Sequence, residues 1–470
     1  MRPNILLIYT DQQRFDTIRA LGNGHIHTPN LDRLVGEGVA FTYATTPSPV
    51  SLVNRWCLHS GQWSSKNRCY SNHHPGLRPP TDIPKMLRNA GYVTGLSGKN
   101  HSFLTPADMD EWDEAPTLPH HPEWDHYERW ARHREQYYPR LAEEPVWTSI
   151  TAEHAKTASA LRFMEQHGNS DKPFFLWLSY LYPHTPYEAP EPFFSMYADL
   201  PPPAVESDAL ATAGKPFRQQ FHQRNNDAVI PFAEEQINLM RRVYYGMVTL
   251  IDAEIGKILD FLDERGLANN TLLVFTSDHG DYQGDHGLLA KSPALYDVLV
   301  RVPLIVRWQG QIDAGRLDDR FASHIDLLPT FAAAAGVPYP PQAQGVNLLP
   351  CLRDGGKGGA IRPFAFSEYG VPGKPYDEAR LTDEGLSNTI FTNPSNDRLS
   401  WEGNPVSLSG RIRMLRNHRW KLVDEENGNG ELYDLKNDPH ELSNLWDNPQ
   451  YSAIRGEMQS QLVDWLAAIT

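Results

Sequence analysis

Short, wholly apolar runs alternate with longer helical patterns over the first two thirds of the chain, and each run ends in polar residues. Runs of this kind are typical of strands that are buried on both faces of a parallel sheet. The helical spacing is clearest over Gln236–Leu262. Strands that alternate with helices predict an α/β fold, with a doubly wound, mostly parallel sheet flanked by helices. The predicted strands are Asn4–Tyr9, Tyr92–Leu96, Pro173–Tyr180 and Thr271–Thr276.

Capping and breaking residues place further helices between these strands. Thr28 is expected to cap a helix over 29–35 that has proline in its first turn. Two more helices are expected over Ser51–His59 and Asp82–Ala90.

Beyond about residue 345, glycine and asparagine become frequent and the predicted strands become short. Strands at Arg413–Leu415 and Trp420–Val423, followed by an amphipathic helix at Tyr451–Ile469, predict a smaller α+β unit. We therefore expect a catalytic domain over 1–345 and a C-terminal subdomain over 346–470 that completes the pocket.

Two segments exceed ordinary loop lengths and are candidate pocket walls or lids, namely 105–145 and 188–232. The first segment is rich in aromatic residues that could stack on a sugar or an aryl group, or enclose a quaternary ammonium. Simple packing is the alternative explanation. These aromatic residues are Trp112, Trp124, Trp130 and Tyr138.

The amino-acid composition argues against several kinds of binding partner and of structure. The 43 basic and 58 acidic residues give a net charge of −15, which argues against nucleic-acid and anionic-membrane binding. Three cysteines are too few for a disulfide framework, and no apolar run approaches the roughly 20 residues that span a bilayer. The first residues predict a strand and not a signal peptide, so a cytoplasmic protein is expected. The composition leaves room for a homo-oligomer.

Candidate site residues follow the predicted strands directly. Asp11, Lys99, His184 and Asp278 each come just after such a run. Ligands of doubly wound sheets lie beyond the carboxyl ends of the strands, so these side chains are expected to converge on one edge.

These residues and their neighbours carry recognisable chemistry. Asp11, Asp278 and His279 offer two carboxylates and an imidazole, a donor set suited to Mn²⁺, Mg²⁺, Ca²⁺ or Zn²⁺. Ser51 is expected at a helix start, where the helix dipole favours an oxyanion, and Arg55 lies one turn further on. Each of these residues alone has an ordinary structural explanation, such as a turn or a helix cap.

Four further side chains supply cations and proton donors for a tetrahedral oxyanion and its leaving group. Their number in an acidic protein indicates a small anionic ester as substrate. They are Lys99, His101, His184 and Lys291. Five other histidines are expected to be structural, namely His25, His27, His120, His121 and His324.

The chain resembles the sulfatase family of the alkaline-phosphatase superfamily over nearly its whole length. NILLIYTDQQ is similar to the opening metal-binding strand of that family, PSPVSLVNRWCLHSG to its nucleophile segment, and SGKNHSF to its Gly-Lys-x-His element. LYPHTPY is similar to the Pro-His-x-Pro element, and TLLVFTSDHGDYQGDHGLLAK to the second metal segment with its lysine. ELYDLKNDPHELSNL resembles the C-terminal Leu-Tyr-Asp-Leu element.

The resemblance implies an alkaline-phosphatase-like fold, one catalytic divalent metal and hydrolysis of a sulfate or phosphate ester. It assigns metal binding to Asp11, Asp278 and His279, with Ser51 as the fourth ligand and the nucleophile. The side chains that it places around the anion are Arg55, Lys99, His101, His184 and Lys291, with His184 or Lys291 as the acid for the leaving group.

The metal motifs depart from those of many sulfatases, which carry paired acids in the first motif and Asp-Asn in the second. This chain has Asp11-Gln12 and Asp278-His279, which resembles the phosphonate monoester hydrolase and choline sulfatase branches. Those branches use a manganese-like site. We therefore expect Mn²⁺ first, with Ca²⁺, Mg²⁺ or Zn²⁺ as alternatives, and Gln12 as a weak or indirect ligand.

The segment that contains Ser51 differs more strongly from the sulfatase pattern than the metal motifs do. Sulfatases carry Cys or Ser in a Cys-x-Pro-x-Arg segment that a maturase converts to formylglycine, whereas this chain reads Ser51-Leu52-Val53-Asn54-Arg55. Val53 replaces the expected proline or alanine, so formylglycine at Ser51 is not expected. A plain serine favours a phosphoester, because water can hydrolyse a phosphoserine whereas a sulfated serine would stall.

The favoured hypothesis is a metal-dependent phosphodiesterase or phosphonate monoester hydrolase with Ser51 as nucleophile. A sulfuric ester hydrolase acting on a sugar or small molecule is one alternative. A phosphomutase is a second, although the carboxylate cluster for a second metal is missing. A catalytically decayed protein that only binds an anion is a third.

Overall fold

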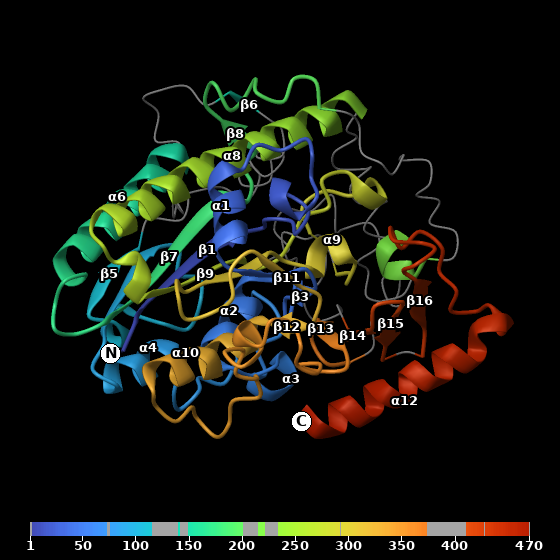
Figure 1. The fold of residues 1–470 in the computed structure, drawn as a ribbon. Coiled ribbons are helices and arrows are strands. Elements are labelled where there is room, and N and C mark those ends of the chain that lie inside the picture. The colour runs from blue at the N-terminus through green and yellow to red at the C-terminus, as the bar shows by residue number, and fades with distance from the viewer. Residues whose placement is uncertain are drawn as a thin grey trace, which may run out of the picture.

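The computed structural model describes residues 2–72, 76–114, 140–141, 149–200, 215–220, 234–291, 293–373, 410–426 and 428–469. An eight-stranded sheet with the order β11-β2-β10-β9-β1-β7-β4-β5 forms its centre (Figure 1). Its strands are β1 (Asn4–Asp11), β2 (Val39–Phe41), β4 (Val93–Gly98), β5 (Glu111–Asp113), β7 (Phe174–Pro183), β9 (Thr271–Ser277), β10 (Leu304–Arg307) and β11 (Arg316–Asp318).

The sheet is mostly parallel, as predicted. Strands β9, β1, β7, β4 and β5 run in one direction, and only β10 is antiparallel to its neighbours β9 and β2 among the described strands. All eight residues of β1 are buried. Leu6 and Ile8 pack on one face of the sheet, whereas Ile5, Leu7 and Tyr9 pack on the other. This alternation follows from the two-residue period of a strand and explains why the run is apolar throughout.

Helices cover both faces of the sheet, as the doubly wound prediction requires (Figure 1). Helices α1 (Pro29–Glu37), α6 (Ser149–His167) and α8 (Glu234–Glu264) pack on the face of Leu6 and Ile8. Helices α4 (Ile83–Asn89) and α10 (Leu327–Ala335) pack on the opposite face.

The remaining short elements connect these layers. Two-stranded pairings join β3 (Ala44–Thr45) to β12 (Ala322–Ser323), and β6 (Arg140–Leu141) to β8 (Glu188–Ala189). The short helices are α2 (Ser51–Ser60), α3 (Ser64–Asn67) and α9 (Asp297–Val300). The 3₁₀ turns are η1 (Arg19–Leu21), η2 (Pro106–Asp108), η4 (Ala268–Asn270), η5 (Asp285–Gly287), η6 (His324–Asp326), η7 (Cys351–Arg353) and η9 (Pro449–Tyr451).

The predicted cap of α1 is corrected by the structure. Thr28 occupies the N-cap position, but its hydroxyl accepts from the backbone N–H of Arg19 and makes no capping hydrogen bond. The Asp252 carboxylate on α8 instead accepts from the N–H groups of Asn30 and Leu31, at 3.1 and 2.7 Å. The cap therefore comes from a distant helix, which ties α1 to α8.

The two long segments expected as pocket walls lie partly within the structure. Trp112 sits on β5, which pairs with β4 at the sheet edge, so this part of 105–145 is sheet and not a lid. Trp124, Trp130 and Tyr138 lie outside the described residues, as does much of 188–232.

The C-terminal part contains the predicted short strands and final helix. An antiparallel sheet of order β13-β14-β15-β16 packs beside α12 (Ser452–Ile469), and Figure 1 shows both away from the central sheet. Its strands are β13 (Ala365–Tyr369), β14 (Ile412–Arg416), β15 (Trp420–Glu425) and β16 (Gly430–Asp434). The fold class is thus confirmed, and the division between residues 345 and 346 stays a prediction. Among the described residues, no helix is long and apolar enough to cross a membrane.

A buried ionic cluster links this sheet to α9. The Asp297 carboxylate at the start of α9 accepts from Arg416 and from Lys421 Nζ, the latter at 3.0 Å. Lys421 also pairs with Glu441 at 2.6 Å, and the Glu441 carboxylate accepts from the Asp297 N–H. Burial alone would raise the pKa of Asp297, but Arg416, Lys421 and Arg301 lower it below its usual range.

Replacing Asp297 tests this link. Asp297→Asn should lower the free energy of unfolding at pH 7 by about 3–5 kcal/mol, because it leaves buried Arg416 without its carboxylate and Lys421 with Glu441 only. The pKa of Asp297 is lower in the folded chain than the usual value of about 3.9, so its stabilisation is present above that pH and lost as the pH falls. Urea denaturation of wild type and variant should therefore differ clearly at pH 7 and converge in acid.

Asp260→Asn is the matched control, because Asp260 is 70% exposed and faces Arg33 at 3.6 Å. Its effect should stay below about 1 kcal/mol. Equal urea midpoints for the two variants would contradict a stabilising role for the cluster.

Candidate active site

Four neighbouring strands carry polar residues to the same edge of the sheet. Asp11 is the last residue of β1, and Asp278 follows β9 directly. His184 follows β7 and Lys99 follows β4. Because these strands lie in the order β9-β1-β7-β4 and run parallel, their carboxyl ends deliver all four side chains to one site.

Two fully buried carboxylates form the centre of this site. The Arg55 Nη2 group donates to Asp11 Oδ2 at 3.1 Å and to Asp278 Oδ2 at 3.3 Å. Lys99 Nζ donates to Asp11 Oδ2 at 2.5 Å. Burial alone would raise the pKa of Asp11, but Lys99, His184 and Arg55 outweigh it and lower that pKa well below its usual range.

The negative charge of the Asp278 carboxylate is offset less by nearby positive charges than that of Asp11. Its Oδ1 accepts from the backbone N–H groups of Gln12 and His279, both at 2.9 Å. Burial, and then the charge of Asp11, nevertheless raise the pKa of Asp278 to about 7. A further positive charge beside this pair would therefore favour the ionised form.

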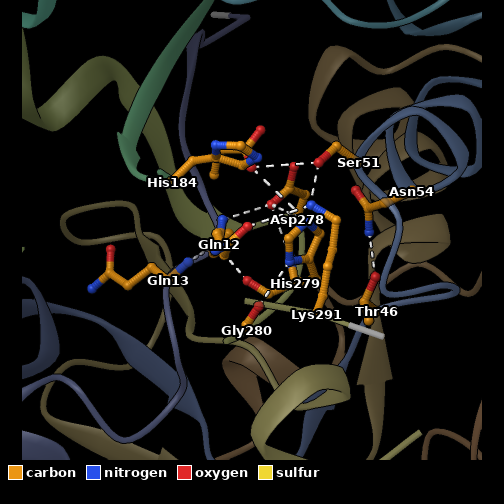
Figure 2. A network of polar contacts seen from close by, with 12 residues as sticks. Gln12, Gln13, Thr46, Ser51, Asn54, His184, Asp278, His279, Gly280 and Lys291 are labelled. Atoms are coloured by element: carbon orange, nitrogen blue, oxygen red, sulfur yellow. Dashed lines mark hydrogen bonds and ion pairs between the residues drawn. The ribbon is translucent and has the colours of Figure 1, made fainter. Parts of the chain in front are cut away.

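Helix α2 begins at Ser51, as predicted, and Arg55 follows one turn later. Val50 precedes the helix and gives no side-chain cap, and the helix start brings the Ser51 hydroxyl to the cluster. Ser51 Oγ lies 3.0 Å from His279 Nε2 and 3.4 Å from Asp11 Oδ1 (Figure 2).

The tautomer of His279 follows from its second contact. Its Nδ1 lies 2.8 Å from the carbonyl oxygen of Gly280, which can only accept, so Nδ1 carries the proton. The Nε2 lone pair therefore faces Ser51 and the carboxylates. Burial, and then Lys291, lower the pKa of His279 well below its usual range, which keeps the ring neutral.

Lys291 and Gln12 also reach the cluster, Gln12 on the left of Figure 2 and Lys291 beside His279. Lys291 is buried, and its Nζ donates to Gln12 Oε1 at 3.4 Å. Gln12 has a φ of 72°, in the left-handed region that residues with a side chain rarely adopt. Its backbone carbonyl accepts from Tyr244 at 2.7 Å, which helps to hold this turn.

The two histidines expected near the anion are both largely buried. Burial lowers the pKa of His184 to about 3, and its Nδ1 donates to the carbonyl oxygen of Thr185 at 2.7 Å. Burial, and then Lys99 and Arg55, lower the pKa of His101. His101 Nδ1 has no hydrogen-bond partner within the part of the chain that the structure describes. Both rings are therefore neutral near pH 7.

A buried network behind Ser51 was not predicted. Asn54 Nδ2 donates to Thr46 Oγ1 at 2.6 Å and lies 2.6 Å from His324 Nδ1. Thr276 Oγ1 lies 2.8 Å from His324 Nε2, and the Tyr9 hydroxyl donates to Asn54 Oδ1. This network joins α2 to strands β1 and β9, and it gives His324 the structural role expected of it.

Asp281 was also not singled out, although it stands only three residues after Asp278. Its carboxylate accepts from Gln12 Nε2 at 2.5 Å and from the Tyr187 hydroxyl at 2.7 Å. The signal in the sequence was its place in the Asp278-His279-Gly280-Asp281 segment.

The donor set at the centre fits a divalent cation. One ligand atom each from Asp11, Asp278 and His279 lies within 4.8 Å of the others, and all three residues are buried. Ser51 Oγ adds an oxygen beside them. Carboxylate oxygens with one imidazole suit Mn²⁺, Mg²⁺, Ca²⁺ or Zn²⁺.

Comparison with known proteins adds the family. The family model described as Sulfatase matches residues 3–337, and the model described as N-sulphoglucosamine sulphohydrolase, C-terminal, matches residues 402–467. The chain is 29% identical to the multifunctional alkaline phosphatase superfamily protein PehA of Trinickia caryophylli, over 99% of this chain and 95% of that protein. It is 27% identical to the choline-sulfatase of Rhizobium meliloti, over 96% and 83%. The crystal structure of the phosphonate monoester hydrolase of Agrobacterium radiobacter superposes with a TM-score of 0.76 at 26% identity, covering 100% and 96% of the two chains.

Binding of a divalent metal should raise the free energy of unfolding of the protein. Mn²⁺ at about 100 times its Kd should raise the free energy of unfolding by about 2.7 kcal/mol relative to protein stripped by a chelator. Asp278→Asn should lose most of this gain, because it removes a charged ligand. The stripped variant should melt no lower than stripped wild type, since it no longer buries a second carboxylate.

Asp16→Asn serves as the control for the thermal melts. Asp16 pairs with Arg14 at 2.7 Å outside the cluster, so this variant should keep the full response to Mn²⁺. The same loss of response in both variants would contradict the assignment of Asp278.

Proposed function

The chain belongs to the sulfatase family, and from this premise we propose that it is a divalent-metal-dependent hydrolase that cleaves a phosphoester through an unmodified Ser51. Phosphodiesters and phosphonate monoesters are the favoured substrates, and the substrate is a small anionic ester such as a sugar or aryl ester. The observation that carries this proposal is the nucleophile segment, in which a serine at the metal cluster is followed by Val53. The named similarity to a phosphonate monoester hydrolase supports it.

Val53 is the reason to expect an unmodified serine. Formylglycine formation in this family is associated with proline or alanine at that position. Val53 is buried and packs with Cys57 in the core that joins α2 to the C-terminal sheet. The side chain thus serves packing in this chain, and Ser51 acts as a plain hydroxyl nucleophile.

An unmodified serine nucleophile favours a phosphorus ester over a sulfate ester as the substrate. A formylglycine hydrate releases sulfate by breaking its own C–O bond, which needs no attack on the sulfated intermediate. A serine intermediate must instead be hydrolysed by water at the tetrahedral centre. Phosphoserine undergoes this step in relatives within the superfamily, whereas a sulfated serine would accumulate.

In the first step, Ser51 loses its hydroxyl proton to solvent and its Oγ attacks phosphorus in line, while the bond from phosphorus to the leaving alcohol oxygen breaks. A divalent metal held by Asp11, Asp278 and His279 would polarise the ester as a Lewis acid. Lys99 and Lys291 neutralise the developing negative charge. In the second step, water attacks phosphorus, the bond to Ser51 Oγ breaks, and the serine recovers its proton.

His184 is proposed as the acid for the leaving alcohol. It is neutral without substrate, with the proton on Nδ1, so it must first take up a proton at Nε2. A bound anion favours that uptake, because it stabilises the imidazolium. Lys291 is the other candidate for this role, and His101 is proposed to assist the attacking water.

Arg55 is proposed to support the reaction from behind the carboxylates. Its guanidinium donates to Asp11, Asp278 and Ser179, and it lies against the ring of Tyr9 at 4.9 Å. Through these contacts Arg55 orders the carboxylate pair, and its charge is proposed to help Lys99 and Lys291 to neutralise the developing negative charge.

Hydrolysis of a sulfate ester is the second candidate, because choline-sulfatase is among the similar proteins. It requires either conversion of Ser51 by a maturase that accepts Val53, or another route that resolves a sulfated serine.

Matched nitrophenyl esters test the proposal directly. The Mn²⁺-loaded protein should hydrolyse the phosphate diester or phosphonate monoester fastest, while the phosphate monoester is slower and the sulfate is unreacted. Ser51→Ala should lower kcat by a factor on the order of 10³ or more, because it removes the nucleophile. Sulfate as the best substrate would overturn the proposal, and turnover unaffected in Ser51→Ala would exclude Ser51 as nucleophile.

The chemical state of Ser51 can be measured independently of turnover. Mass spectrometry of the peptide that contains Ser51 should give the mass of unmodified serine. Val53→Pro, expressed beside a maturase, restores the usual segment and is the matched comparison. A wild-type peptide lighter by two hydrogens would show that formylglycine forms despite Val53.

A further inference from the structure

We propose that Asp281 is a positioning residue that fixes the side-chain amide of Gln12, so that its oxygen and not its nitrogen faces the metal cluster. This inference rests on the metal requirement of the proposed function. It concerns the residues that orient a possible ligand, and it does not depend on which ester is cleaved.

The first contact that fixes the amide lies on the Asp281 side. Asp281 is fully buried, and its Oδ2 lies 2.5 Å from Gln12 Nε2 and 2.7 Å from the Tyr187 hydroxyl. Its Oδ1 accepts from the backbone N–H of Gln283 at 2.8 Å. A carboxylate with these contacts is an acceptor, so the group that Gln12 turns toward it must be the NH₂ donor.

The second contact lies on the opposite side of the same amide. Lys291 Nζ lies 3.4 Å from Gln12 Oε1, and an ammonium can only donate. A reversed amide would set its oxygen against the Asp281 carboxylate and its NH₂ group against the Lys291 ammonium. Both contacts would then be repulsive, so the two charged neighbours select the same orientation.

The main chain of Gln12 leaves little other freedom. Its N–H donates to Asp278 Oδ1 at 2.9 Å, and its carbonyl accepts from the Tyr244 hydroxyl at 2.7 Å. The side chain is fully buried. The rotation of the terminal amide is therefore the remaining variable, and Asp281, with the shorter of the two contacts, contributes most to fixing it.

The consequence is a neutral oxygen donor on the Lys291 side of the site. The cluster already holds two buried carboxylates and one imidazole. An amide oxygen adds a lone pair without adding a third negative charge to that cluster. Residues that orient ligands in this way are typically worth a factor of about 10–100 in metal affinity.

A double-mutant cycle on Mn²⁺ affinity tests the inference. Calorimetric titration of metal-stripped protein would compare wild type, Asp281→Asn, Gln12→Ala and the double variant. Asp281→Asn should raise the Kd for Mn²⁺ by about 10–100-fold. An amide at residue 281 can turn its own NH₂ group toward Gln12, and the Gln12 amide then loses the acceptor that fixes its orientation. In the Gln12→Ala background the same substitution should change the Kd little, because the group on which Asp281 acts is gone.

Asp252→Asn is the matched control. Asp252 is a buried carboxylate that likewise accepts from a side-chain amide, that of Asn30 at 3.0 Å, and it lies outside the cluster. This variant should leave the Kd for Mn²⁺ unchanged. If Asp281→Asn fails to fold, Asp281→Ser replaces it in the cycle, because it removes the carboxylate that accepts from Gln12 Nε2.

Three results would overturn the inference: no change of the Kd in Asp281→Asn, an equal change in the Gln12→Ala background, or no Mn²⁺ binding by wild type. A different result would overturn the proposed function. A protein that shows the coupled loss of Mn²⁺ affinity but hydrolyses no phosphorus ester would keep the role of Asp281 and lose the proposed substrate class.

Discussion

The placement of two carboxylates at the buried ends of adjacent parallel strands is the constraint on which this structure depends. Asp11 and Asp278 are fully buried, and ionised carboxylates in the interior are costly unless they are paired. Arg55 and Lys99 provide that pairing, and each comes from a different element of the fold. The site therefore exists only when β1, β9, β4 and α2 are assembled together.

The surrounding polar contacts follow from the same constraint. Hydrogen-bonding groups that are buried near the carboxylates are costly without a partner, and the Asn54 network and Asp281 supply partners for several of them. The Asn54 network holds α2, which carries Ser51, against β1 and β9, and Asp281 holds the Gln12 amide. The proposed choice of phosphorus over sulfur rests mainly on Ser51 and Val53.

Sequence reasoning reached the sheet, its flanking helices and the side chains at the strand ends, because these depend on local periodicity and on one topological rule. It also placed Ser51 at a helix start, since proline and small polar residues precede the helix locally. It failed where the partner is distant along the chain. Asp252 caps a helix more than two hundred residues away, and His324 reaches Asn54 across a similar separation. No window of sequence contains both members of such pairs, so only the folded chain reveals them.

Arg55 and Lys99 have a consequence for how the site would fill. Their two positive charges formally balance Asp11 and Asp278, so the chain alone keeps this part of its core near neutrality. A divalent cation then adds charge to a balanced cluster that already has Lys291 beside it. An arriving anion would offset that excess, so a cation and an anionic ester would each strengthen the binding of the other. By thermodynamic linkage the two effects are equal, and an enzyme of this kind would hold its metal more tightly while substrate is present.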